Sequence, residues 1–205
     1  MDPRTITIDD VDELELNPVR GSAETREARL RERVETFVAW AVDRERYVLD
    51  DSVTSAHLLL IAAEHLESLG ELDRALELAE RAAASDDVAP FEATPTLISI
   101  RLARGETAAA VALADELRRG GTDDALLVEQ VAETFEHAGE LAAAERWNVI
   151  GLRVLERLGD ADAYQRSSFL SGRYRSRRDA GRPIDVLDTE TEQLRASLGR
   201  EPIGS

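Results

Sequence analysis

Gly70-Glu-Leu-Asp-Arg-Ala75 is the first of four glycine-led segments that decide the fold of this chain. The others are Gly105-Glu-Thr-Ala-Ala-Ala110, Gly139-Glu-Leu-Ala-Ala-Ala144 and Gly181-Arg-Pro-Ile-Asp-Val186. Their glycines lie 35, 34 and 42 residues apart, and a period of about 34 residues is typical of a solenoid of helical hairpins. Because stacked hairpins present an extended surface, the pattern favours a binding protein over an enzyme.

Composition supports an all-α fold. The chain has 205 residues, of which 43% are hydrophobic, so it can form one sizeable domain with its own core. Only 4% of the residues are aromatic. Alanine and leucine must therefore supply most of the packing, which suits closely spaced helices better than a β-sandwich.

The charge balance restricts the partners. With 25 basic and 42 acidic residues, the formal net charge is -17, which opposes general binding to nucleic acid or to anionic membranes. Cationic or neutral partners are favoured. The absence of cysteine excludes disulfides and thiolate metal sites. The N-terminal residues do not resemble a leader peptide and no apolar run is long enough to span a membrane, so we expect a cytoplasmic protein.

The spacing of apolar residues and helix caps predicts the domain organisation. We expect an acidic extended arm over residues 1–21, one helical domain over 22–198 and a tail over 199–205. We also expect Trp40 and Trp147 to lie in the core rather than to stack on a ligand. The predicted helices cover about 22–49, 53–69, 72–84, 92–104, 107–119, 124–138, 141–158, 161–180 and 184–198.

Each glycine is followed by small residues at fixed distances, and this pattern resembles the tetratricopeptide repeat family. The three clear copies read Gly70, Ala75, Ala79, Ala82; Gly105, Ala110, Ala114, Leu117; and Gly139, Ala144, Asn148, Gly151. The resemblance implies a right-handed superhelix of three to four antiparallel hairpins, here preceded by one long N-terminal helix. The fourth copy departs from the pattern, with Val186, Glu190 and Gln193 in the corresponding places. It is either a divergent repeat or a cap.

A fainter likeness concerns the segment from Ser171 to Pro183. It is similar to the last repeat of bacterial tetratricopeptide proteins that end in a metal-binding SEC-C motif. That motif needs cysteines, which this chain lacks. No metal site and no cofactor is therefore expected from the likeness.

In the tetratricopeptide family, the first helix of each hairpin lines a groove that receives peptides. The resemblance implies an acidic groove here, in which carboxylates on one helix face repel one another and favour a basic peptide segment. The alternative is a solvated helix face in a very acidic protein. The implied groove residues are His57, Leu60, Ile61, Glu64, Glu67, Glu92, Thr96, Ser99, Glu129, Gln130, Glu133, Glu136 and His137.

An arginine cluster near the C-terminus is the one strongly basic stretch. We expect Arg173, Arg175, Arg177 and Arg178 to be able to clamp a phosphate or a peptide carboxylate with their planar side chains. The alternative is ion pairing with the surrounding acidic surface.

The sequence contains no catalytic motif such as a phosphate loop or a nucleophile elbow. Glu133 and His137 share a helix face, but a zinc site needs three or four convergent ligands. We therefore expect a non-enzymatic scaffold or adaptor that binds a protein or peptide. The alternative is a regulator or sensor of the same repeat type, and self-association through uncapped solenoid ends is compatible with both.

Overall fold

The computed structural model describes residues 2–18, 20–89, 91–159 and 162–203. Within these ranges, ten helices and two short strands form an all-α fold, as the sequence predicts. The chain falls into two compact units, Met1–Thr107 and Ala108–Ser205. The units are not placed relative to each other, so the single domain over 22–198 and the right-handed superhelix stay predictions.

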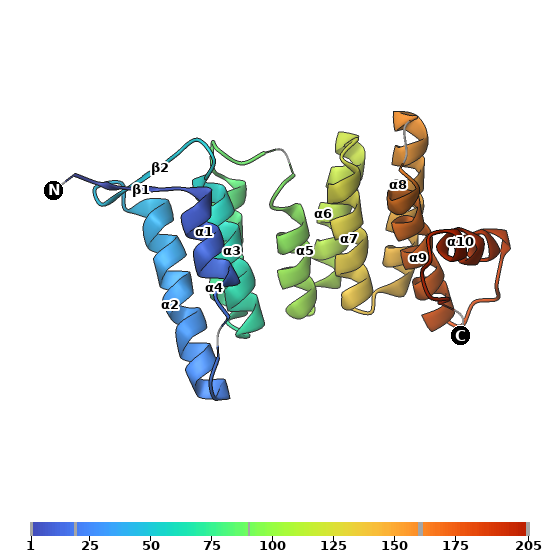
Figure 1. Ribbon diagram of the computed structural model, residues 1–205, viewed down its shortest axis with the longest axis horizontal. Coiled ribbons are helices and arrows are strands. Elements are labelled where there is room, and N and C mark those ends of the chain that lie inside the picture. The colour runs from blue at the N-terminus through green and yellow to red at the C-terminus, as the bar shows by residue number, and fades with distance from the viewer. Residues whose placement is uncertain (1, 19, 90, 160–161, 204–205) are drawn as a thin grey trace. The chain divides into compact units, whose positions relative to one another are not determined.

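The first unit is a layer of helices in which α2 packs on α3, α3 on α4, and α5 on both α3 and α4 (Figure 1). Its largest fully buried side chains include Phe37, Leu58, Leu66 and Ile98. Trp40 is also buried, with 6% of its surface exposed, as expected. The elements are β1 Arg4–Ile6, α1 Ile8–Leu16, α2 Ala23–Val42, β2 Tyr47–Leu49, α3 Ser55–Ser68, α4 Leu72–Ala83 and α5 Thr94–Ala103.

Residues 4–6 and 8–16 form β1 and α1, so the prediction of an extended arm over 1–21 is wrong for this part. Thr7 and Asp10 form a capping box that starts α1, which satisfies two otherwise unpaired backbone amides. Ile6 and Val11 are buried against the unit, with 0% and 2% of their surfaces exposed. The acidic composition of this segment gave no indication in the sequence that Ile6 and Val11 are buried and anchor it.

The long helix expected over 22–49 ends earlier, at Val42. Residues 47–49 form β2, which pairs in parallel with β1 so that Thr5 lies opposite Val48. Residues 47–49 therefore form a strand that pairs with residues 4–6, and they do not continue the helix.

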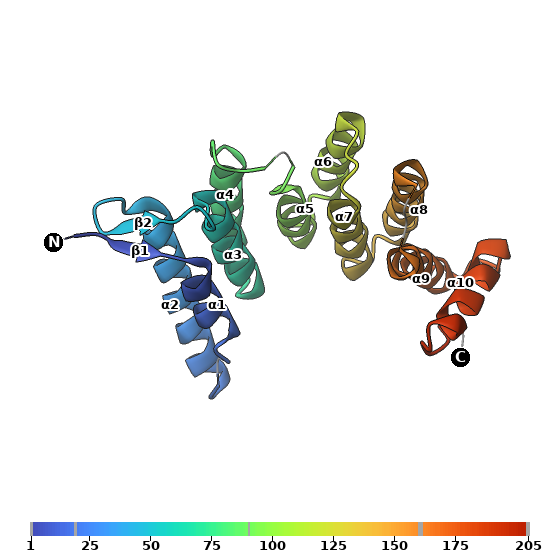
Figure 2. The ribbon, with the colours of Figure 1, turned by 45° about the horizontal axis from the view of Figure 1, so that its top comes forward.

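The second unit contains four complete helices and most of a fifth, α6, which begins at Thr107. In this unit α7 packs on α8, α8 on α9, and α9 on α10 (Figure 2). Trp147 is buried with 3% of its surface exposed. The first residue of the helix expected over 161–180 lies outside the described residues. The helices are α6 Thr107–Gly120, α7 Ala125–His137, α8 Leu141–Leu158, α9 Ala163–Asp179 and α10 Val186–Ser197.

All four glycines of the repeat form the same turn. Gly70, Gly105, Gly139 and Gly181 have φ between +67° and +76°, a left-handed conformation that glycine adopts without a steric penalty. In each, the glycine amide bonds the carbonyl three residues back, and the next amide bonds the carbonyl five residues before it. This is the Schellman arrangement, which satisfies the last carbonyls of a helix and turns the chain back.

Helices α8 and α9 approach each other through a reciprocal pair of glycines. A Cβ atom on Gly151 of α8 would lie 2.1 Å from the Phe169 ring, and one on Gly172 of α9 would lie 2.5 Å from the Asn148 amide oxygen. Each helix therefore offers a glycine to a larger side chain of the other. The two small positions explain how Phe169 becomes fully buried.

The longer spacing before Gly181 comes from longer helices. α8 has 18 residues and α9 has 17, against 12 in α4 and 13 in α7. The extra residues precede the glycine turn, so the turn itself is unchanged. After it, α10 begins only at Val186, which is 83% exposed. In the other three copies, the residue five positions after the glycine is an alanine that is fully buried: Ala75, Ala110 and Ala144.

We expect Gly139→Ala to lower the free energy of unfolding by about 1 kcal/mol, because alanine, unlike glycine, is sterically strained in the left-handed conformation at this position. No atom lies within 4 Å of the added methyl group, so the loss reports backbone strain alone. The matched control is Gly120→Ala at the helical end of α6, where alanine should be neutral or slightly stabilising. Urea unfolding of both variants checks the opposite signs; equal losses would contradict the assignment.

Candidate functional site

The predicted groove residues of the first unit gather where α3 faces α5. The Thr96 hydroxyl donates to a Glu64 carboxylate oxygen at 3.1 Å, and the Ser99 hydroxyl donates to Glu67 at 2.5 Å. Both pairs join residues 32 positions apart, close to one repeat. Neither carboxylate makes an ion pair among the described residues.

The environment of Glu64 disfavours its charge. Desolvation raises the pKa of Glu64, and the neighbouring charges of Glu67 and Glu15 raise it further. The hydrogen bond from Thr96 and the charge of His65 oppose this shift but do not cancel it. The carboxylate therefore lies beside two other acids and makes no ion pair among the described residues, an arrangement that a partner's cation would relieve.

The remaining groove residues of this unit differ in accessibility. His57 and Ile61 are partly exposed on α3. Leu60 is buried, with 6% exposed, and packs into the core rather than lining a surface. Glu92 is used locally, because its carboxylate accepts the Ala89 amide at 2.9 Å.

In the second unit, α7 faces α9 in a corresponding way. The Ser168 hydroxyl donates to Glu129, and the Arg175 guanidinium makes two bonds to Glu136, at 2.6 and 2.9 Å. Glu136 precedes Gly139 by three residues, as Glu67 precedes Gly70. Their partners Arg175 and Ser99 both precede the next glycine by six. The repeat register is therefore kept between neighbouring first helices in both units.

The other predicted residues of α7 are Gln130, Glu133 and His137, and all three are exposed. No hydrogen bond or ion pair of the Glu133 carboxylate is found in the described ranges. Its register position faces Gly172, which has no side chain to offer. The acidic face of the second unit therefore keeps Glu129 and Glu133, since Arg175 neutralises only Glu136.

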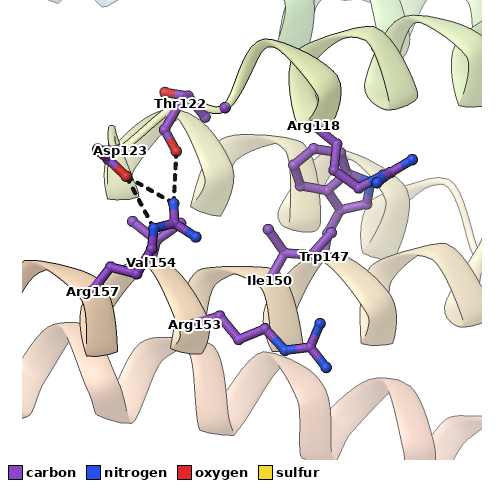
Figure 3. Close-up of a pocket in the computed structure, with 9 residues that line it drawn as sticks. Arg118, Thr122, Asp123, Trp147, Ile150, Arg153, Val154 and Arg157 are labelled. Atoms are coloured by element: carbon purple, nitrogen blue, oxygen red, sulfur yellow. Dashed lines mark hydrogen bonds and ion pairs between the residues drawn. The ribbon is translucent and has the colours of Figure 1, made fainter.

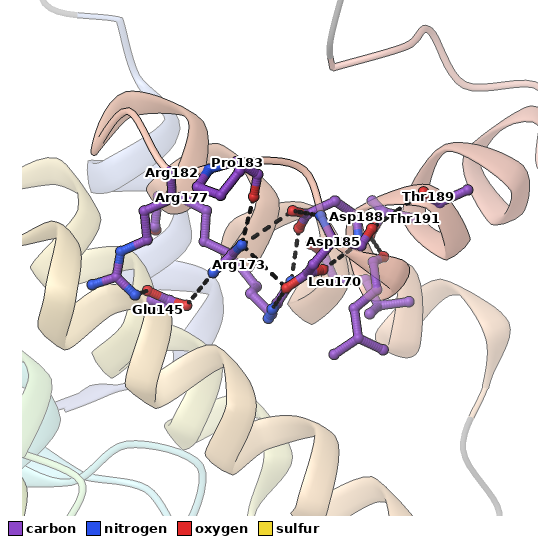
Figure 4. A network of polar contacts seen from close by, with 12 residues as sticks. Glu145, Leu170, Arg173, Arg177, Arg182, Pro183, Asp185, Asp188, Thr189 and Thr191 are labelled. Atoms are coloured by element: carbon purple, nitrogen blue, oxygen red, sulfur yellow. Dashed lines mark hydrogen bonds and ion pairs between the residues drawn. The ribbon is translucent and has the colours of Figure 1, made fainter.

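The arginine cluster is engaged within the protein, so the structure favours the alternative of intramolecular pairing. Arg173 contacts Asp188 at 2.7 Å and also pairs with Asp185. Arg177 contacts Glu145 and Asp188, both at 3.1 Å (Figure 4). The remaining two members of the predicted anion site are also occupied: Arg175 by Glu136, and Arg178 by Asp179 and the Ile203 carbonyl.

This network fastens α10 to α8 and α9. The side chains of Arg173 and Asp188 are 8% and 1% exposed. Asp185 and Asp188 also cap α10 reciprocally through each other's backbone amides, both at 3.0 Å. The hydrogen bond from Arg173 lowers the pKa of Asp185 to about 2, against the opposing effect of burial.

Residues of the network were missed by the sequence analysis. Asp185 and Asp188 have the spacing of a capping box after Pro183, and this signal marks a helix start. Their additional role as counter-ions of buried arginines has no local signature. Glu145 lies 32 residues before Arg177, which again is close to one repeat.

Two further observations limit the chemistry. In the part of the chain that the structure describes, no three His, Asp or Glu side chains converge as a metal site would require. Over the same residues, no helix is both long enough and apolar enough to cross a membrane.

Comparisons with protein-family models, with curated proteins and with solved structures give no match to this chain. The tetratricopeptide resemblance therefore stays a prediction.

We expect Asp188→Ala to destabilise the second unit by about 3–5 kcal/mol, because it removes the buried carboxylate shared by Arg173 and Arg177 and leaves Arg173 only the more exposed Asp185. The double variant Arg173→Met with Asp188→Leu should recover most of the loss, since both buried charges are removed together. Urea unfolding, monitored by circular dichroism, measures the free energy of unfolding of both variants. A single variant as stable as the parent would contradict this role of Asp188.

We expect the stabilising contribution of Asp185 to be lost in acid. Its pKa of about 2 in the folded state lies below the unfolded value, which is about 3.9. Its contribution is therefore fully present above pH ~4 and is lost as the pH falls toward ~2. Asp185→Asn keeps a good helix cap, so its stability deficit relative to the parent should shrink over this range. A constant deficit would contradict the assignment.

Proposed function

We propose that this protein is a non-enzymatic peptide-binding module of the tetratricopeptide type. Its first unit would receive a basic segment of a partner protein on the face where α3 meets α5. We define this acidic face by Glu64, Glu67 and Ser99, with the buried Thr96 hydroxyl beneath Glu64 and with His57 and Ile61 at its side.

The observation that carries the proposal is a missing cation. Elsewhere in the first unit, arginines pair with carboxylates, as Arg101 and Arg104 do with Glu106. Glu64 and Glu67 have only hydroxyl donors, and the pKa of Glu64 is raised by desolvation and by neighbouring acids. A lysine or arginine of a partner would supply the absent charge, and this interaction would weaken with salt.

We expect a short arginine-rich peptide to bind the protein, and the variant Glu64→Gln with Glu67→Gln to weaken binding by about tenfold, from two lost charge contacts. The amides can still accept from Thr96 and Ser99. Fluorescence anisotropy at low and physiological ionic strength measures the affinity. Because charging Glu64 costs stability, the variant should be at least as stable as the parent at pH 7.

The control must remove the same charge elsewhere, because any cation is attracted to a protein of net charge -17. Glu77 on α4 and Glu116 on α6 are exposed and make no ion pair in the described ranges. Glu77→Gln with Glu116→Gln should change the affinity by less than about twofold. Equal losses in the two double variants would show general attraction and reject the proposed face.

A further inference from the structure

A groove between α6 and α8 in the second unit is lined mainly by arginine. It consists of two cavities of about 450 and 430 Å³, which share Arg118, Ile150 and Arg153. Five arginines and two carboxylates line the pair of cavities. Basic residues therefore outnumber acidic ones in this lining, whereas acidic residues outnumber basic ones in the whole chain. We call this surface the α6–α8 groove.

Among the described residues, three of its five arginines are weakly engaged or unpaired, whereas Arg157 pairs with Asp123 at 2.8 Å and Arg182 with Glu145 at 2.7 Å. Arg118 and Arg146 share one carboxylate, that of Asp115, at 3.3 and 3.1 Å. Arg153 is exposed and makes no hydrogen bond or ion pair in the described part of the chain. Arg118 and Arg153 extend on either side of Ile150 and Trp147, whereas Arg157 turns toward Asp123 and Thr122 (Figure 3). The part of the groove that both cavities share therefore holds two guanidinium groups with unused donors.

The shape and floor of the groove favour a peptide over a nucleotide. The Trp147 ring is buried, with 3% of its surface exposed, so it cannot stack on a base. Ile150 and Val149 are partly exposed between the arginines. The two adjoining cavities also extend beyond what one small anion would fill. An extended chain with carboxylates and apolar side chains would match both the rim and the floor.

We propose that the α6–α8 groove binds an acidic peptide segment of a partner protein, with Arg153 and Arg118 holding its carboxylates and Ile150 contacting its apolar side chains. The site does not depend on the acidic face of the first unit. It uses other residues and selects ligands of the opposite charge.

The test uses the full chain and a short fluorescein-labelled peptide of alternating glutamate and leucine. The parent should bind it, with an affinity that falls as salt increases. Arg153→Gln should weaken binding by about threefold to tenfold, and Arg118→Gln with Arg153→Gln should weaken it further. Arg153 has no partner among the residues that the structure describes, so thermal unfolding of the single variant should match the parent.

The matched control is Arg81→Gln. Arg81 is exposed on α4 and makes no ion pair in the described ranges, so its loss should leave peptide affinity unchanged. Equal effects of Arg81→Gln and Arg153→Gln, or no binding at low salt, would overturn the proposal. Competition by inorganic phosphate as effective as by unlabelled peptide would also overturn it, since the site would then recognise a single small anion.

The same variants separate this site from the proposed function. Arg153→Gln should not weaken binding of the arginine-rich peptide, because the α6–α8 groove and the acidic face have no residue in common. Loss of acidic-peptide binding with retained basic-peptide binding would support the groove. Failure of basic-peptide binding alone would reject only the acidic face.

Discussion

The left-handed glycine that ends the first helix of every repeat constrains the rest of this protein. At Gly70, Gly105, Gly139 and Gly181 the same two backbone hydrogen bonds close the helix. A helix that ends at a fixed residue presents a fixed face to its neighbour. The contacts Glu67–Ser99 and Glu136–Arg175 consequently occur at equivalent positions, although the side chains differ.

This constraint explains why an insertion is tolerated before the fourth glycine. The additional residues lengthen α8 and the beginning of α9, where they extend the helices without moving the turn. Close packing of the longer helices then requires Gly151 and Gly172, which admit Phe169 and Asn148. Beyond Gly181 the pattern ends, and α10 is held by charged groups rather than by small apolar residues.

The sequence predicted the helices well because their signals are local. Eight of the nine predicted ranges agree within two residues with helices α3 to α10, counting only described residues. The N-terminal helix α1 was missed because its anchors are single residues, Ile6 and Val11, in an acidic segment. The partners of the arginine cluster were missed because they come from α7, α8 and α10, which only the fold brings near α9.

The register and the charge of the predicted binding face depend on different features of the fold. Register depends on helix periodicity, which places Glu64 and Glu67 beside Thr96 and Ser99. Net charge on a face depends on which cations fold against it. Arg175 neutralises Glu136 in the second unit, whereas no described arginine pairs with Glu64 or Glu67.

The placement of arginine gives this acidic chain two chemically different surfaces. Arginines that meet carboxylates across a helix interface, such as Arg173 and Arg177, are used for stability. On α6 and α8, Arg118 and Arg146 share the single carboxylate of Asp115 and Arg153 makes no ion pair among the described residues, so part of their charge is left unpaired at the groove. A high net negative charge thus does not limit the protein to cationic ligands, because specificity is set by the local balance of paired and unpaired groups.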